Sequence, residues 1–243
     1  MALTDVAPRL APRLAASVEE GDAPQRLPDA TGQDLLEGGF LRVLQPQRWG
    51  GGELSFVEFL DGVMKVAESN ASAGWVAGVI GVHRWQLASF PEQAQEEMWA
   101  ADASVMHSSS YAPTGTARQV SGGYRVSGRW SFSSGCDHCR AVNFGAVAGM
   151  RTLSDTELPD FHAFTLYCGQ YQIIDNWQTT GMRGTDSKDI VVDDVLVPEH
   201  GSQSHFDYAF NISLPGREKN DDVLYRLPWA PVFNLALAGR SDW

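Results

Sequence analysis

The stretch RQVSGGYRVSGR, residues 118–129, decides the fold of this protein. Two short runs flank Gly122 and Gly123, and a two-residue glycine link of this kind is typical of a β-hairpin. From about residue 104 onward, short runs separated by glycine replace the helical pattern that precedes them. Further strand candidates are residues 141–148, 161–167, 171–177 and 189–197. The sequence therefore predicts a β-domain over roughly the second hundred residues.

The first hundred residues have the pattern of packed helices. Ser55 and Glu58 have the spacing of a capping box, which predicts a helix that runs through Glu68. Ser72 is expected to cap the next helix, and Pro91 to end it and begin a short polar one. We therefore expect an α+β protein with an all-helical domain over residues 1–103, an antiparallel β-barrel or sandwich over residues 104–200, and an irregular tail over residues 201–243.

Composition excludes several classes of function. The chain has 243 residues, with 18 basic against 30 acidic side chains and a formal net charge of -12. Such a charge repels phosphate backbones and anionic lipid, so we expect neither nucleic acid nor a membrane as partner. The N-terminus lacks a continuous apolar core of signal-peptide length, which predicts a cytoplasmic protein.

Two clusters combine small hydroxyl groups with aromatic side chains. The first is WSFSSGCDH, residues 130–138, and the second is SSSYAP, residues 108–113. Hydroxyls next to aromatics suit a flat heterocycle that forms hydrogen bonds. Ordinary amphipathic strands whose serines face water give the same pattern, so residue types alone leave both interpretations open.

Two further features have a structural and a functional interpretation. His83 lies in an apolar helix, where a histidine is either a core residue or a base whose charge changes near neutral pH. Cys136 and Cys139 form a Cys-x-x-Cys pair that could bind zinc or cycle as a dithiol. A structural zinc site needs four ligands, and no second pair lies at a suitable spacing, so we expect no metal.

The sequence lacks the common glycine-rich motifs for binding a nucleotide and for presenting a nucleophilic serine. It contains no Gly-x-Gly-x-x-Gly after a strand, no Gly-Lys-Ser/Thr phosphate loop and no Gly-x-Ser-x-Gly elbow. If the protein uses electrons from a nicotinamide, we expect another protein to supply them.

Several segments in order resemble one family. These segments are residues 44–51, 74–76, 81–88, 94–97, 108–113, 130–138, 181–185 and 192–198. Together they resemble the oxygenase components of two-component flavin-dependent phenol hydroxylases, within the acyl-CoA dehydrogenase superfamily. The match extends over about residues 25–230, and the last two segments are shared with acyl-CoA dehydrogenases generally.

The resemblance implies a reaction and a set of partners. A separate NAD(P)H-dependent reductase supplies reduced FMN, with FAD as an alternative, and O2 then forms a flavin hydroperoxide that hydroxylates a phenol. The family also implies a homo-oligomer, a tetramer in the relatives. The flavin contacts implied by motif position are Trp75, Ser109, Ser110, Tyr111, Phe132, Ser133 and Ser134.

Two of the residues acquire a catalytic role through the resemblance. Ser134 is similar to the family serine at the reactive edge of the flavin, and His83 to the histidine that helps to deprotonate the phenol. Relatives continue into a C-terminal helical bundle, which we expect this chain to lack. Two alternatives therefore stay open: a flavin oxidoreductase of the acyl-CoA dehydrogenase type, and a non-catalytic fragment that associates with full-length relatives.

Overall fold

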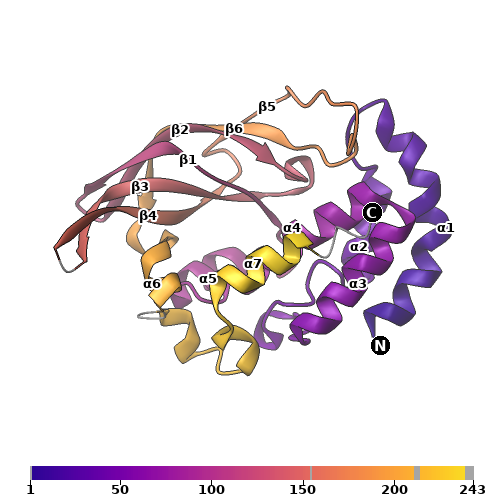
Figure 1. The fold of residues 1–243 in the computed structure, drawn as a ribbon, viewed down its shortest axis with the longest axis horizontal. Coiled ribbons are helices and arrows are strands. Elements are labelled where there is room, and N and C mark those ends of the chain that lie inside the picture. Colours follow the sequence, from indigo (N-terminus) through magenta and orange to yellow (C-terminus); the bar gives the residue numbers. More distant parts are fainter. Residues whose placement is uncertain (1, 154, 211–213, 239–243) are drawn as a thin grey trace.

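A computed structural model describes residues 2–153, 155–210 and 214–238, and the side chains of these except residues 235–238. Figure 1 shows a sheet above a layer of helices, with the C-terminal helix running between them. The helical layer comes mainly from the first hundred residues. Its elements are α1 (Leu3–Asp22), α2 (Asp29–Glu37), α3 (Phe56–Ser69), α4 (Ala71–Leu87) and α5 (Glu92–Trp99).

Local capping explains where the two central helices begin. The predicted capping box at α3 is confirmed, since Ser55 and Glu58 accept hydrogen bonds from each other's backbone N–H. The prediction for α4 was wrong, because Asn70 rather than Ser72 is the cap. The Asn70 backbone is extended and its Oδ1 accepts the Ala73 N–H at 3.0 Å, while Ser72 already lies inside the helix.

The β-domain forms one seven-stranded sheet in the order β5-β6-β2-β1-β3-β4-β7. The predicted glycine hairpin is confirmed: it joins β1 to β2, with Val120 opposite Gly123. The α+β class is confirmed as well, although β1 and β3 pair in parallel and only the other neighbours are antiparallel. The strands are β1 (His107–Val120), β2 (Gly123–Ser133), β3 (Ala141–Leu153), β4 (Thr156–Tyr167), β5 (Gln172–Ile174), β6 (Lys188–Pro198) and β7 (Ser202–Ser204).

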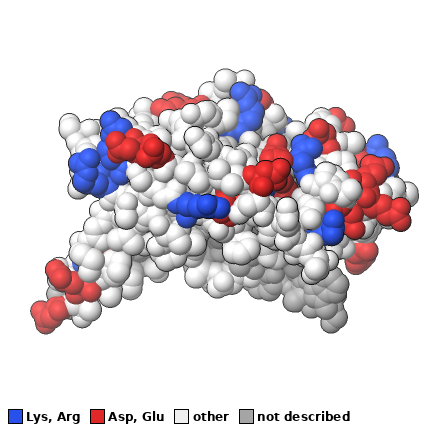
Figure 2. All heavy atoms as spheres, turned by 90° about the horizontal axis from the view of Figure 1, so that it is seen from above, with Lys and Arg blue, Asp and Glu red and all other residues white. Residues whose placement is uncertain are grey.

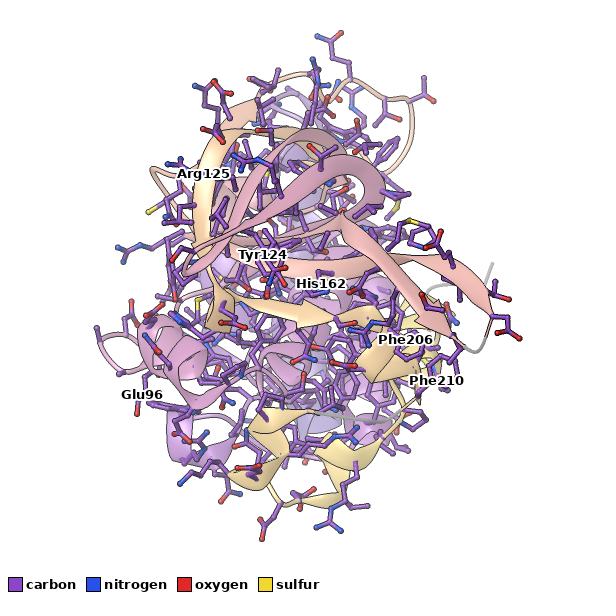
Figure 3. The ribbon with its side chains drawn as sticks, turned by 90° about the vertical axis from the view of Figure 1, so that its left-hand side faces the viewer. Glu96, Tyr124, Arg125, His162, Phe206 and Phe210 are labelled. Atoms are coloured by element: carbon purple, nitrogen blue, oxygen red, sulfur yellow. The ribbon has the colours of Figure 1, made fainter. Side chains whose placement is uncertain are left out.

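Trp130 is the centre of the sheet's own core. It is fully buried, its ring lies 4.5 Å from that of Phe144, and its Nε1 donates to the Gly145 carbonyl at 2.7 Å. A Cβ on Gly115 would lie 1.9 Å from the indole, so glycine is required where the strand crosses it. Tyr124 and His162 lie side by side on the sheet, with ring centroids 5.5 Å apart (Figure 3).

The C-terminal segment differs from the irregular tail that the sequence predicts. Two helices form there, α6 (His205–Phe210) and α7 (Trp229–Ala238), and α7 packs against α4. Tyr225 donates to the Leu44 carbonyl at 3.2 Å, and Trp85 donates to the Leu224 carbonyl at 2.8 Å. This segment is therefore part of the helical core, where apolar contacts override its weak local pattern. Residues 239–243 lie outside the described part, and the domain limits at residues 103 and 200 stay a prediction.

Charged side chains of both signs occur on the surface of the protein. On the face that Figure 2 presents, acidic and basic side chains are interspersed around a broad neutral area. Among the helices that the structure describes, none is long and apolar enough to cross a membrane.

Candidate functional site

A chain of hydrogen bonds begins at the Trp75 indole on α4 and continues through hydroxyl groups just after the end of β2. The Trp75 indole donates from Nε1 to the Ser134 hydroxyl at 2.8 Å. That hydroxyl lies 2.8 Å from the Ser187 hydroxyl, which lies 2.7 Å from that of Thr185. Ser134 and Ser187 are both buried. Three segments far apart in the sequence thus meet at one small polar group.

The turn that carries Ser134 is held in an uncommon backbone conformation. Phe132 has a φ of 66° and Gly135 a φ of 70°, both in the left-handed region. Glycine adopts this region freely, but for phenylalanine it is strained, and such strain persists where function or the surroundings require it. The Gly135 N–H donates to the Thr185 carbonyl at 2.8 Å and so fixes the turn against the loop before β6.

Phe132 also stands out because a large apolar side chain is left in water. Its side chain is 70% exposed, and its ring meets Trp177 edge to face at 6.3 Å. An exposed aromatic ring on a strained turn, paired with the half-buried Trp177 and next to a hydrogen-bonded serine, suits the face and edge of a planar ligand.

A second polar group surrounds His83, farther along α4. The His83 Nε2 lies 2.5 Å from the Ser109 hydroxyl, and Nδ1 lies 3.2 Å from the Gln86 Oε1. Tyr111 donates to the same Gln86 oxygen at 2.6 Å. Burial lowers the pKa of His83 to about 4, partly offset by Gln86, so its imidazole is neutral at pH 7.

Not all the predicted site residues belong to these two groups. The Ser133 hydroxyl donates to that of Ser108 at 2.9 Å, and the Ser110 hydroxyl donates to the Ser131 carbonyl at 2.6 Å. Both contacts join β1 to β2 within the sheet. The side chains of Ser133 and Ser110 therefore stabilise the sheet beside the site. A ligand could contact these two residues through their backbone groups.

Helix α4 sets the separation of the two groups. Trp75 and His83 are eight residues apart on it, which corresponds to about 12 Å along the helix axis. A ligand that contacts both Ser134 and the surroundings of His83 must span a similar length.

Helix α7 covers the His83 group with aromatic rings. The Phe233 ring lies 5.5 Å from His83 and 6.0 Å from Tyr111, and Trp229 stacks on Phe233 at 4.5 Å. Neither of these two residues was assigned a role from the sequence, and neither were Gln86, Thr185 and Ser187. The signal for Trp229 and Phe233 was the apolar run after residue 224, whose place in the fold depends on tertiary contacts.

The chain is similar to known proteins in sequence and in fold. No family model matches the chain. It is 43% identical over 223 residues to the "Flavin-dependent monooxygenase, oxygenase subunit HsaA" of Rhodococcus jostii, covering 92% of this chain and 57% of that protein. The crystal structure of 3-HSA hydroxylase from Rhodococcus sp. RHA1 superposes with a TM-score of 0.92 at 38% identity, over 99% of this chain and 61% of that one.

The chain is homologous to the oxygenase subunits of flavin-dependent monooxygenases. A further relative of this oxygenase family is the oxygenase component of an FADH(2)-dependent resorcinol hydroxylase from Rhizobium sp., 32% identical over 88% of this chain and 51% of that protein. The structure of XiaF from a Streptomyces species, in complex with FADH2 and glycerol, has a TM-score of 0.79 at 26% identity. The present chain spans between half and two thirds of the length of these four proteins.

Beside the site, a cluster of charges holds the loop that carries Thr185 and Ser187. The Lys188 ammonium lies 2.6 Å from Asp137, 3.0 Å from Asp186 and 3.4 Å from Asp175. Burial opposes the charge of Lys188, but its hydrogen bonds to Asp137 and Asp186 outweigh this and raise its pKa. Burial raises the pKa of Asp186 to about 6.

Potential metal ligands occur within the same charge cluster. The ligand atoms of Cys136, Asp137 and Asp186 lie within 4.8 Å of one another. Lys188 contacts both carboxylates, and an ammonium at this place repels a cation. Burial also raises the pKa of the Cys136 thiol, which disfavours the thiolate that binds metals.

Replacing Lys188 with Met is expected to destabilise the protein by about 3 kcal/mol at pH 8, because the buried carboxylate of Asp186 loses its cation. A carboxyl whose pKa is raised on folding stabilises the fold at low pH and loses that contribution as the pH rises through about 6. The difference in the free energy of unfolding between the wild type and the variant should therefore become smaller as the pH falls below 6. Urea unfolding across this pH range measures it.

The matched control is Lys65→Met, which removes an exposed ion pair with Glu68. Such pairs contribute less than about 1 kcal/mol, so this variant should unfold almost like the wild type at every pH. Equal stability of the Lys188 and Lys65 variants at pH 8 would contradict the role of the buried cluster.

Proposed function

We propose that this chain acts in the hydroxylation of a phenolic ring by reduced flavin and O2. The observation that carries the proposal is the contact of Trp75 with Ser134, placed beside the exposed ring of Phe132 on a strained turn. The names of the relatives support a monooxygenase over the alternative of an acyl-CoA dehydrogenase.

The residues present fit a flavin. Its isoalloxazine is planar, with hydrogen-bonding atoms along one edge, and the site offers a serine hydroxyl and an exposed aromatic side by side. FMN is the proposed cofactor, with FAD as an alternative, and when bound it supplies the electrons that activate O2. Ser134 is proposed to hold the reactive edge and Phe132 to contact the ring, with Trp75 orienting Ser134. The segments that carry Ser109, Ser110, Tyr111 and Ser133 complete the proposed contacts.

His83 is the proposed base for the phenol. Because it is neutral at pH 7, its Nε2 can accept a proton from an incoming hydroxyl group, in the place where Ser109 now donates. Deprotonation makes the carbon ortho to the phenol oxygen more nucleophilic. Phe233 and Trp229 exclude water from this position, which preserves the interaction.

Partners follow from the same proposal. Reduced flavin comes from a separate NAD(P)H-dependent reductase, because the relatives are named as oxygenase subunits or components and the sequence lacks a dinucleotide-binding motif. The substrate is a phenolic small molecule, and assembly into a homo-oligomer is proposed on the resemblance alone. A non-catalytic role beside full-length relatives is the alternative that the test below separates.

Ser134→Ala is expected to weaken flavin binding about fivefold, the effect of one lost hydrogen bond in a partly buried site. Fluorescence titration with FMN and FAD measures the affinity, and supplying reduced flavin, O2 and a panel of phenols measures product. Ser121→Ala, at the exposed hairpin turn, is the control and should leave both unchanged. Failure of the wild type to bind either flavin at high protein concentration would favour the non-catalytic alternative.

A further inference from the structure

We propose that Gln86 is a positioning residue that holds His83 as the neutral tautomer protonated on Nδ1, so that Nε2 is available to accept a proton. This inference rests on the proposed function and names the device that prepares its base. Gln86 contacts one residue of the proposed flavin set, Tyr111, but not Ser134, and its proposed role is exerted through His83.

The contacts of Gln86 place a single oxygen between two donors. Gln86 follows His83 by three residues on α4, so the two side chains share one face of the helix. Its Oε1 lies 3.2 Å from the His83 Nδ1 and accepts the Tyr111 hydroxyl at 2.6 Å. Gln86 is fully buried, so protein groups rather than bulk water decide its orientation.

The number of satisfied donors and acceptors among the described residues distinguishes this arrangement from the one in which the oxygen and nitrogen of the Gln86 amide are exchanged. With Oε1 facing His83, the protons of Tyr111 and Ser109 both find acceptors, the amide oxygen and the His83 Nε2. The group without a partner is then the Gln86 amide nitrogen alone.

Exchanging the positions of the Gln86 amide oxygen and nitrogen costs more free energy, because more buried polar groups lose their partners. Its nitrogen would donate to Tyr111 and to Nδ1, which moves the imidazole proton to Nε2. The hydroxyl protons of Tyr111 and Ser109 and the amide oxygen would then lack their present partners. A buried polar group without a partner costs about 1 to 3 kcal/mol, so the first arrangement is favoured.

No carboxylate is among the titratable side chains that surround His83 in the described structure. They are Arg84 on α4, His107 and Tyr111 on β1, with His205 and Tyr208 of α6 packed behind Tyr111. Arg84 bonds to the carbonyls of Ala103 and Ser104 and to the Gln45 side chain. The amide of Gln86 therefore supplies orientation to His83 without supplying the negative charge that would protonate it.

The test reads the tautomer directly in the unliganded protein. Long-range proton–nitrogen correlation spectra of protein labelled with ¹⁵N-histidine distinguish a protonated Nδ1 from a protonated Nε2, and His83→Gln assigns the signals. The expected result is Nδ1–H with an unprotonated Nε2 at pH 7. The opposite tautomer of His83 in the wild type would overturn the proposal.

Two variants then measure the role of the amide. Gln86→Glu places a carboxylate against Nδ1 and should raise the pKa of His83, by about 1 to 3 units for an opposite charge in contact. Since the neutral imidazole is the active form, the acidic limb of the hydroxylation profile should move to higher pH. Gln86→Leu should give a mixture of both tautomers. Gln93→Glu, at an exposed position of α5, is the matched control and should change neither the spectrum nor the pH profile.

The two proposals fail in different ways. Absence of hydroxylation together with the expected tautomer refutes the proposed function and leaves the role of Gln86 intact. Hydroxylation with an unchanged pH profile in Gln86→Glu refutes the role of Gln86 and leaves the proposed function intact.

Discussion

Replacing His83 with Ala is expected to reduce hydroxylation of a phenol at least about 100-fold, the usual lower range for loss of a general base. Flavin affinity should change less than about twofold, because His83 belongs to a different hydrogen-bonded group from Ser134. Product formation under excess reduced flavin measures the first effect, and fluorescence titration measures the second. The variant should also release more hydrogen peroxide, because oxygen that is reduced but not transferred to the ring leaves in that form.

His200→Gln provides the control for this experiment. His200 pairs with Glu97 at 2.9 Å, where the loop after β6 meets α5, and it belongs to neither polar group of the site. Its replacement should leave hydroxylation unchanged. Unchanged turnover in His83→Ala would refute the assignment of the base, while a loss of flavin binding in that variant would show that the two groups form one cofactor site.

Replacing Trp130 with Ala is expected to destabilise the protein by about 4 kcal/mol, the usual range for truncating a large buried aromatic side chain. The indole is fully buried, packs on Phe144, and fills the space that Gly115 and Gly128 leave open. Its loss leaves a cavity and removes the donor to the Gly145 carbonyl. Urea or thermal unfolding followed by circular dichroism measures the change.

Phe132→Ala is the matched control, two residues away on the same strand. Because Phe132 is 70% exposed, its truncation should change stability by less than about 1 kcal/mol. It should instead weaken flavin binding, which separates a core aromatic from a proposed ligand contact within one segment. A large loss of stability in Phe132→Ala with none in Trp130→Ala would contradict the packing described above.

Most of the fold could be predicted from local pattern. The glycine pair at residues 122–123, the alternation that follows it and the capping box at Ser55 each depend on neighbours within a few residues. The start of α4 was misplaced because Asn70 and Ser72 both have the residue type of a cap, and only the backbone of Asn70 is extended. The helices after residue 204 were missed because their stability comes from tertiary contacts, those of α7 with α4 and α3 and those of α6 with β4.

The candidate site could be predicted only in part. Ser134, Trp75 and His83 belong to motifs that resemble those of the flavin-dependent phenol hydroxylases, and this resemblance predicted their roles. Gln86 and Thr185 also lie in segments that carry the resemblance, but neither they nor Ser187 were assigned a role, since a glutamine in an apolar helix or a serine in a loop has many ordinary roles. Their importance appears when Oε1 is found 3.2 Å from the His83 Nδ1, and when the Ser187 hydroxyl is found 2.8 Å from that of Ser134.

The hairpin of residues 118–129, which the sequence alone determined, places β1 beside β2 and so brings Ser109 into one sheet with the strand that ends just before Ser134. Turn and strand preferences act between near neighbours, and this is why they can be read along the chain. Only the tertiary structure decided how α4 lies against that sheet and which proton His83 carries. Those features depend on hydrogen bonds between groups that are distant in sequence, and a buried donor or acceptor is satisfied by whatever the folded chain brings to it.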